Sequence, residues 1–267
     1  MDWVVAPLQP VPEPEPPMAP EGWRTGPPGY VGVGAQRSGT TWWHRLISAH
    51  PGVCFERELH RKEVHFFDTL GDRDRLPEVD IQRYARHFPR PPGGALVGEW
   101  TPDYMDFPWV AGQLAQSAPE ARVLMMLRDP VDRYASGFAR ASRIAAERGI
   151  KGIEPQLAER HVERGMYFEQ VRRFLEVFAP ERVLVLQYEA CRARRAEELR
   201  RTFAFLELDP SLGPAPDQLR SREPRERSLS RGERERLAER FAPDVRKLAK
   251  LLPELDLSLW PSVAERA

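Results

Sequence analysis

The stretch that decides the fold reads Gly34-Ala35-Gln36-Arg37-Ser38-Gly39-Thr40-Thr41. It follows a short apolar run at residues 30–33 and leads into a helix-like segment at residues 42–47. A strand, a glycine-bounded loop and a helix in this order direct backbone N–H groups and a helix N-terminus at a bound phosphate. The two glycines have the Walker A spacing, but Thr40 stands where that motif has its lysine, which argues against a nucleoside triphosphatase. The stretch predicts an anion-binding loop with two hydroxyls and one cation; the alternative is a glycine-rich turn without a ligand.

Three further apolar runs, at residues 95–98, 123–127 and 183–186, alternate with helix-like patterns. Their unbroken apolar character is typical of strands buried on both faces of a parallel sheet. Residues 168–178 have helical spacing, and residues 230–233 fit a capping box that opens a last helix. The pattern predicts an α/β fold, a single P-loop-like domain whose central, mostly parallel sheet is flanked by helices and binds ligands at the carboxyl ends of its strands.

Composition and charge narrow the class of protein further. The chain has 267 residues and a formal net charge of zero, so its overall field gives no sign of affinity for nucleic acid or a membrane. No apolar run approaches the roughly 18 residues of a membrane span, and the first residues lack a signal-peptide pattern. We expect a cytoplasmic protein. The sequence does not indicate an oligomeric state.

Residues 1–28 are rich in proline, which predicts an extended or disordered arm and leaves residues 29–267 as the domain.

The two cysteines, Cys54 and Cys191, cannot form a disulfide framework, and neither lies in a metal-ligand spacing. We expect no bound metal.

A second candidate anion site follows the run at residues 123–127. The run ends in Arg128-Asp129-Pro130, and a proline suits the first turn of a helix. Arg128 at the strand end and Ser136 two turns along that helix could together bind a second phosphate. In the alternative interpretation, Arg128 forms a surface ion pair with Asp129 and Ser136 is a packing residue.

The two sites in this order resemble those of the sulfotransferases that use 3′-phosphoadenosine 5′-phosphosulfate, PAPS. The resemblance covers about residues 29 to 260. It implies that the loop residues Arg37, Ser38, Gly39, Thr40 and Thr41 hold the 5′-phosphosulfate, and that Arg37 also stabilises charge on the departing phosphate. It further implies that Arg128 and Ser136 hold the 3′-phosphate. The product left by the donor would be 3′,5′-adenosine bisphosphate.

A third stretch, Lys62-Glu63-Val64-His65-Phe66-Phe67-Asp68, resembles the Lys-Glu-x-His-Phe-Phe segment of the heparan sulfate branch, in particular the glucosaminyl 3-O-sulfotransferases. We expect a bacterial member. The resemblance implies that Glu63 is the general base, with His65 beside it in catalysis and Asp68 near the acceptor. A hydroxyl is a poor nucleophile and must lose its proton as the S–O bond forms. We expect desolvation beside Phe66 and Phe67 to raise the basicity of Glu63. In the alternative interpretation, Lys62 and Glu63 are solvated on a surface helix. We expect the two phenylalanines themselves to be core residues.

The chain departs from the family pattern at two lysines. Arg37 stands at the usual loop lysine, and Trp100 replaces the lysine of a Glu-Lys-Thr-Pro-x-Tyr segment. Tryptophan cannot bind a sulfate as a cation does, but it can stack on a sugar or an apolar acceptor. We therefore expect Trp100 and Tyr104 to contact the acceptor, a small molecule or a weakly charged glycan. In the loop at residues 220–227, we expect Arg222 and Arg225 to cover the 3′-phosphate.

Taken together, the motifs predict a PAPS-dependent sulfotransferase that acts on a hydroxyl by in-line transfer. Two alternatives remain open. A P-loop nucleotide kinase shares the layout, and Asp129 ends a strand as a Walker B acid would. A non-catalytic nucleotide-binding protein could use the proline-rich arm to recruit partners.

Overall fold

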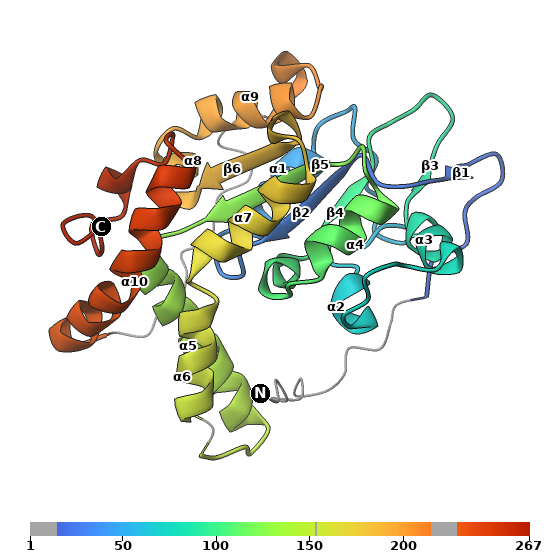
Figure 1. The fold of residues 1–267 in the computed structure, drawn as a ribbon. Coiled ribbons are helices and arrows are strands. Elements are labelled where there is room, and N and C mark those ends of the chain that lie inside the picture. Colours follow the sequence, from blue (N-terminus) through green and yellow to red (C-terminus); the bar gives the residue numbers. More distant parts are fainter. Residues whose placement is uncertain (1–14, 153, 215–228) are drawn as a thin grey trace.

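A four-stranded parallel sheet forms the centre of the computed structural model, which describes residues 15–152, 154–214 and 229–267 (Figure 1). The strand order is β4-β2-β5-β6. Each neighbouring pair is parallel. The strands are β2 (Tyr30–Gly34), β4 (Gly98–Trp100), β5 (Arg122–Leu127) and β6 (Val183–Gln187). The predicted α/β architecture is confirmed.

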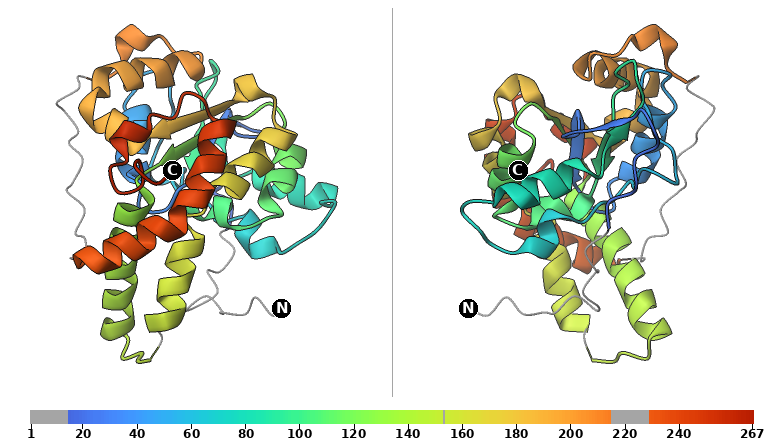
Figure 2. Two further views of the ribbon diagram at one scale, coloured as in Figure 1. Left: turned by 60° about the vertical axis from the view of Figure 1, so that its left-hand side comes forward. Right: turned by 90° about the vertical axis from the view of Figure 1, so that its right-hand side faces the viewer.

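Helices cover both faces of the sheet (Figures 1 and 2). The helices are α1 (Thr40–Ser48), α2 (Phe67–Leu70), α3 (Glu78–Ala85), α4 (Val110–Ser117), α5 (Pro130–Glu147), α6 (Glu154–Glu163), α7 (Tyr167–Val177), α8 (Tyr188–Ala193), α9 (Arg195–Phe205) and α10 (Arg231–Leu251). Helices α4 and α7 pack on one face of the sheet, and α10 packs against α5 and α7. Helices α1, α8 and α9 pack on the other face. Short 3₁₀ turns include η1 (Pro102–Asp106), which follows β4.

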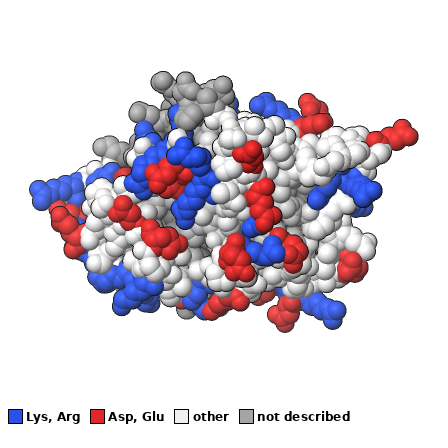
Figure 3. All heavy atoms as spheres, turned by 90° about the horizontal axis from the view of Figure 1, so that it is seen from above, with Lys and Arg blue, Asp and Glu red and all other residues white. Residues whose placement is uncertain are grey.

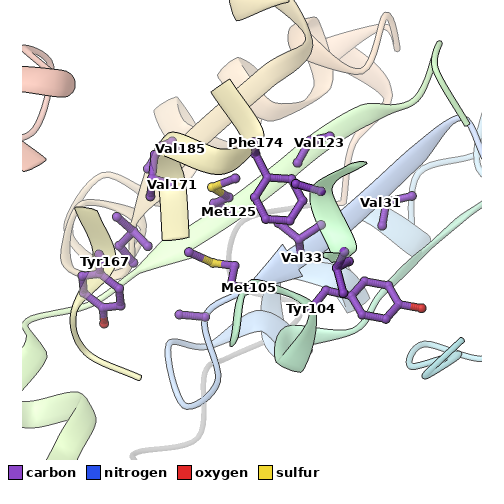
Figure 4. Close-up of a cluster of buried hydrophobic side chains, with 14 of the residues drawn as sticks. Val31, Val33, Tyr104, Met105, Val123, Met125, Tyr167, Val171, Phe174 and Val185 are labelled. Atoms are coloured by element: carbon purple, nitrogen blue, oxygen red, sulfur yellow. The ribbon is translucent and has the colours of Figure 1, made fainter. Parts of the chain in front are cut away.

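The strands are apolar on both faces because successive side chains point in opposite directions. The side chains that pack toward α7 include Val31, Val123 and Met125 (Figure 4). Their neighbours Leu124 and Met126 belong to the cluster on the other face. This two-sided burial explains why unbroken apolar runs predicted β2, β5 and β6.

The expectation of a strand at residues 95–98 is wrong. The strand β4 begins at Gly98 and pairs with β2 through Trp100, while Leu96 makes only an isolated bridge to Val53. The apolar run at residues 95–98 stops before the strand does, because the second residue of the strand is Glu99, whose polar side chain is nevertheless fully buried.

The capping box that the sequence predicts at residues 230–233 is present. Helix α10 opens with a capping box, in which the Ser230 hydroxyl accepts from the Glu233 N–H at 3.3 Å and the Glu233 carboxylate accepts from the Ser230 N–H at 2.8 Å. Of the proline-rich arm, residues 15–28 are described. Within it, β1 (Arg24–Thr25) pairs antiparallel with β3 (Pro89–Arg90).

Gly32 provides a test of how tightly β4 packs on β2. A Cβ atom at this position would overlap the Trp100 indole, so Gly32→Ala should lower the free energy of unfolding by about 1–3 kcal/mol. Gly112 in α4 has nothing within 4 Å of such an atom, so Gly112→Ala should be neutral or stabilising, by up to about 1 kcal/mol. Urea unfolding of both variants measures the difference, and equal effects would contradict the packing.

Candidate active site

The phosphate-type loop joins β2 to α1 and has the backbone geometry that an anion site needs. Gly39 is the N-cap residue of α1 and has a left-handed φ of 89°. A Cβ atom there would also lie 2.6 Å from the Tyr188 ring, so both conformation and space require glycine. The N-terminus of α1, beginning at Thr40, therefore opens directly into the loop, where the positive end of the helix favours a bound anion.

The second predicted site lies against the first. Arg128 is 5% exposed, and its Nη1 atom donates to the Arg37 carbonyl oxygen at 3.4 Å. The Arg37 side chain leaves its own loop and donates from Nε to the buried Ser136 hydroxyl at 3.1 Å. The structure thus brings Arg37, Arg128 and Ser136 together at the ends of β2 and β5.

The alternative of a surface ion pair between Arg128 and Asp129 is wrong. Asp129 is buried and caps α5 by accepting from the N–H groups of Val131 and Asp132 at 2.9 and 3.3 Å. It also accepts from the Ser262 N–H at 3.2 Å. A carboxylate used as a helix cap is not presented to a metal as a Walker B acid would be.

Positive charge accumulates around this pair of sites. The pKa of Arg37 is lowered by its burial and then by the charges of Arg140, Arg128 and Arg143. Cations that destabilise one another create a strong preference for a bound anion. Sequence reasoning missed Arg140 and Arg143, although they follow Ser136 by four and seven residues and so share its helix face.

The segment that carries Glu63 is held beside the loop by β4 and η1. The Trp100 N–H donates to the Lys62 carbonyl at 2.6 Å, and the Val64 N–H donates to the Glu99 carboxylate at 3.0 Å. The Phe66 N–H donates to the Tyr104 hydroxyl at 3.0 Å. A segment without regular structure on this side of the sheet is thereby fixed through its backbone.

Four charged side chains of this segment form a chain. Lys62 Nζ lies 2.5 Å from one Glu63 oxygen, and His65 Nε2 lies 3.6 Å from the other. His65 Nδ1 lies 2.7 Å from Asp68 Oδ2. Lys62 Nζ also lies 3.5 Å from the Thr40 hydroxyl, which links the chain to the phosphate-type loop. The predicted base and the predicted anion loop are therefore neighbours.

The expected rise in the basicity of Glu63 is wrong. Burial acts to raise its pKa, but the hydrogen bond from His65 and the charge of Lys62 outweigh burial and lower the pKa to about 2. Burial likewise acts to lower the pKa of His65, but the hydrogen bonds to Asp68 and Glu63 raise it to about 10. Phe66 and Phe67 are fully buried, so their interpretation as core residues is confirmed.

The expectation that Trp100 and Tyr104 contact the acceptor is also contradicted. Both side chains are 0% exposed. The Trp100 indole N–H donates to the Gly34 carbonyl at 3.1 Å, so this residue supports the loop from below. The Tyr104 hydroxyl donates to Glu99 at 3.1 Å and holds the 62–68 segment.

A partly exposed ion cluster that the sequence did not reveal contacts the loop. Arg164, which follows α6, lies 2.5 Å from an Asp103 oxygen and 2.7 Å from an Asp106 oxygen. Its third contact is a hydrogen bond to the Gln36 side chain in the loop. No local pattern marks this cluster, because its members come from three distant segments.

Arg222 and Arg225 lie outside the described residues. Within the described ranges, no group of three or more His, Cys, Asp or Glu side chains could hold a metal ion. Among the described helices, none combines the length and apolarity that a membrane crossing requires.

The geometry can be compared with known proteins. Residues 30–223 match the family model described as the sulfotransferase domain. The chain belongs to this family. The matched range includes the loop, the Lys62 segment, Arg128 and Ser136, so the predicted family is confirmed, and the matched domain is that of an enzyme.

Curated relatives share only part of their length with this chain. The membrane-associated sulfotransferase kil1 of Dictyostelium discoideum is 29% identical over 114 residues, which are 42% of this chain and 22% of that protein. The human bifunctional heparan sulfate N-deacetylase/N-sulfotransferase 2 is 24% identical over 203 residues, 69% of this chain and 22% of that protein. The matches thus span about a fifth of the length of these relatives.

Solved structures agree with the fold. A sulfotransferase from Alicyclobacillus acidocaldarius superposes with a TM-score of 0.69 at 26% identity, over 88% of this chain and 98% of that one. The sulfotransferase domain of the Synechococcus PCC 7002 olefin synthase gives a TM-score of 0.52 at 15% identity, over 91% of this chain and all of that one, and so indicates the fold alone.

The charge state of His65 can be measured directly. Its pKa of about 10 means that both ring nitrogens carry protons at pH 8, whereas His87, whose pKa is lowered to about 4 by burial and nearby arginines, is neutral there. Because the folded pKa of His65 is raised, its contribution to stability is complete below about pH 6.5 and is lost as the pH rises through about 10. Imidazole ¹⁵N NMR should show these states, and Asp68→Asn should lower the His65 midpoint. A His65 midpoint near 6.5 in the unmodified protein would contradict the ion-pair chain.

Proposed function

We propose that this protein transfers a sulfuryl group from PAPS to an acceptor hydroxyl. The observation that carries the proposal is the contact between the two candidate anion sites. The Arg128 side chain donates a hydrogen bond to the Arg37 carbonyl, and the Arg37 side chain donates one to the Ser136 hydroxyl. A ligand with anionic groups at both ends of one nucleoside fits two such neighbouring sites. The cations that destabilise one another around Arg37 support the same conclusion.

In this proposal each motif has one task. The loop and the N-terminus of α1 bind the 5′-phosphosulfate through Arg37, Ser38, Gly39, Thr40 and Thr41. The 3′-phosphate is bound by Arg128 and Ser136, with Arg222 and Arg225 covering it. Positioning and charge stabilisation supply most of the acceleration, and no metal takes part.

Glu63 is the general base of the proposed reaction, with His65 and Asp68 orienting it. Its side chain is 41% exposed, so an acceptor hydroxyl can reach it. The carboxylate is ionised at neutral pH, as a base must be, because its pKa is lowered to about 2 by the His65 hydrogen bond and the Lys62 charge against the effect of burial. A purely nucleotide-binding protein has no need of an accessible carboxylate beside the anion loop.

The acceptor in our proposal is a small molecule or a weakly charged glycan met in a bacterial cytoplasm. The family position of a lysine is filled by the buried Trp100, so no cation binds the acceptor there. On the face drawn in Figure 3, acidic and basic side chains are interspersed, so this face carries no broad basic patch for a polyanion. A kinase is disfavoured because Thr40 replaces the Walker lysine and Asp129 caps a helix.

Glu63→Gln should reduce sulfuryl transfer by at least about 100-fold, because the amide cannot take the acceptor proton. Binding of 3′,5′-adenosine bisphosphate should be unchanged. Transfer is measured by mass spectrometry of cell extract incubated with enzyme and PAPS, and binding by calorimetry. The matched control Glu58→Gln, at an exposed position, should keep the normal rate. A near-normal rate for Glu63→Gln would remove Glu63 from the mechanism.

Arg128→Ala should weaken binding of 3′,5′-adenosine bisphosphate by about tenfold or more and leave AMP binding nearly unchanged, because only the bisphosphate has a 3′-phosphate. Calorimetry with both nucleotides measures this. Arg172→Ala, on the exposed side of α7, is the control and should change neither affinity. If the unmodified protein bound AMP and the bisphosphate equally, the 3′-phosphate site would be refuted.

A further inference from the structure

Of the two positions where the family carries lysines near the reacting centre, one holds no cation in this chain, because Trp100 is buried beneath the loop. The loop cation Arg37 is retained and contacts Ser136. Transfer leaves a negative charge on the oxygen that links phosphate to sulfur, and a second cation besides Arg37 would stabilise that charge further.

Lys62 meets this requirement from the opposite side of the site. Its Nζ atom lies 3.5 Å from the Thr40 hydroxyl, at the first residue of α1, and 2.5 Å from Glu63. Its backbone is fixed by the hydrogen bond from the Trp100 N–H. Its side chain is 17% exposed. A flexible four-carbon stem on a fixed backbone can move its ammonium group by a few ångströms without moving the loop.

We propose that Lys62 is a further catalytic residue, which contacts Glu63 in the free protein and moves to the phosphosulfate when the donor binds. This inference rests on the proposed function. Thr40 marks the place where the 5′ end of the donor would lie, so the two positions of the ammonium group are adjacent. Lys62 thereby supplies a second cation near the reacting centre, where Trp100 has replaced a lysine of the family pattern.

The chemistry balances with PAPS and a hydroxyl as reactants. The acceptor oxygen forms a bond to sulfur, the bond from sulfur to the bridging oxygen breaks, and the electron pair of that bond stays on the departing phosphate. Glu63 takes the acceptor proton. Lys62 donates a hydrogen bond to the bridging oxygen and keeps its own proton. An ammonium group is well suited to this, since it is a compact charge with three donors.

The same movement would strengthen the base at the moment it is needed. In the free protein Lys62 is one of the groups that lower the pKa of Glu63. When its charge moves to the donor, that effect weakens and Glu63 becomes more basic. The other charged or titratable groups that face Lys62 and Glu63 stay in place. They are His44 from α1, His65 and Asp68 from the same segment, Glu99 from β4 and Asp103 from η1.

Burial explains why the ammonium group would move. Desolvation acts to lower the pKa of Lys62, and Glu63 partly offsets it. A buried cation gains from every anion that it can contact. A donor with charged oxygens at the N-terminus of α1 offers such a contact, and it leaves Glu63 with His65 as its partner at 3.6 Å.

Calorimetry with PAPS and 3′-AMP tests the proposal, because 3′-AMP occupies the Arg128 site but lacks the phosphosulfate. Lys62→Met should weaken PAPS binding by about tenfold or more and leave 3′-AMP binding unchanged. Lys62→Arg should restore part of the PAPS affinity, since it keeps the charge. Lys250→Met, at an exposed position on α10, is the control and should bind both ligands normally. Sulfuryl transfer in cell extract should fall by at least about 100-fold in Lys62→Met.

The outcomes separate the inference from the proposed function. If the unmodified protein binds 3′,5′-adenosine bisphosphate and PAPS but Lys62→Met binds PAPS equally well, the role of Lys62 is refuted and the function stands. If Lys62→Met loses 3′-AMP as well, Lys62 is a structural residue and the inference is refuted. If the unmodified protein does not distinguish the bisphosphate from AMP, the function itself fails. Lys62→Gln serves for the same comparison if the methionine variant does not fold.

Discussion

The buried carboxylate of Glu99 is the constraint on which the site depends. It is 0% exposed and accepts hydrogen bonds from the Val64 N–H and from the hydroxyls of Thr101, Tyr84 and Tyr104. Burial nevertheless prevails over these bonds and raises its pKa to about 7. A buried carboxyl group with this many donors fixes all of them, because losing any one leaves a polar atom unsatisfied in the interior. The segment with Glu63 is attached to the sheet in this way and not by regular secondary structure.

The loop at residues 34–41 and the segment at residues 62–68 are held in place by different interactions. The loop depends on backbone geometry at Gly39, and cations gather beside it around Arg37 and Ser136. The 62–68 segment carries a chain of ion pairs and is fixed to the sheet through its backbone. Thr40 and Lys62 connect the two parts, at 3.5 Å. Because this contact is made by a single flexible side chain, it can change without a shift of the backbone.

The sequence predicted what depends on local pattern and missed what depends on distant partners. The strands β2, β5 and β6, the loop at residues 34–41 and the capping box at Ser230 are all encoded by neighbouring residues, and each was found. The strand β4 was predicted a few residues too early because it contains Glu99, which is a polar residue in the sequence. The Glu99 side chain can be buried only because it has hydrogen-bond partners 2 to 35 residues away. The strength of Glu63 as a base was misjudged for a related reason. Sequence indicates that a group is near aromatics, but the balance of burial against ion pairing needs the distances.

The position of Trp100 limits where a cation can be added beside the loop. Replacing Trp100 with lysine would remove the ring that fills the space above Gly32 and the hydrogen bond that supports Gly34. It would also direct an ammonium group into the layer of apolar side chains behind the loop. The substitution would therefore cost stability before it could change what the site binds.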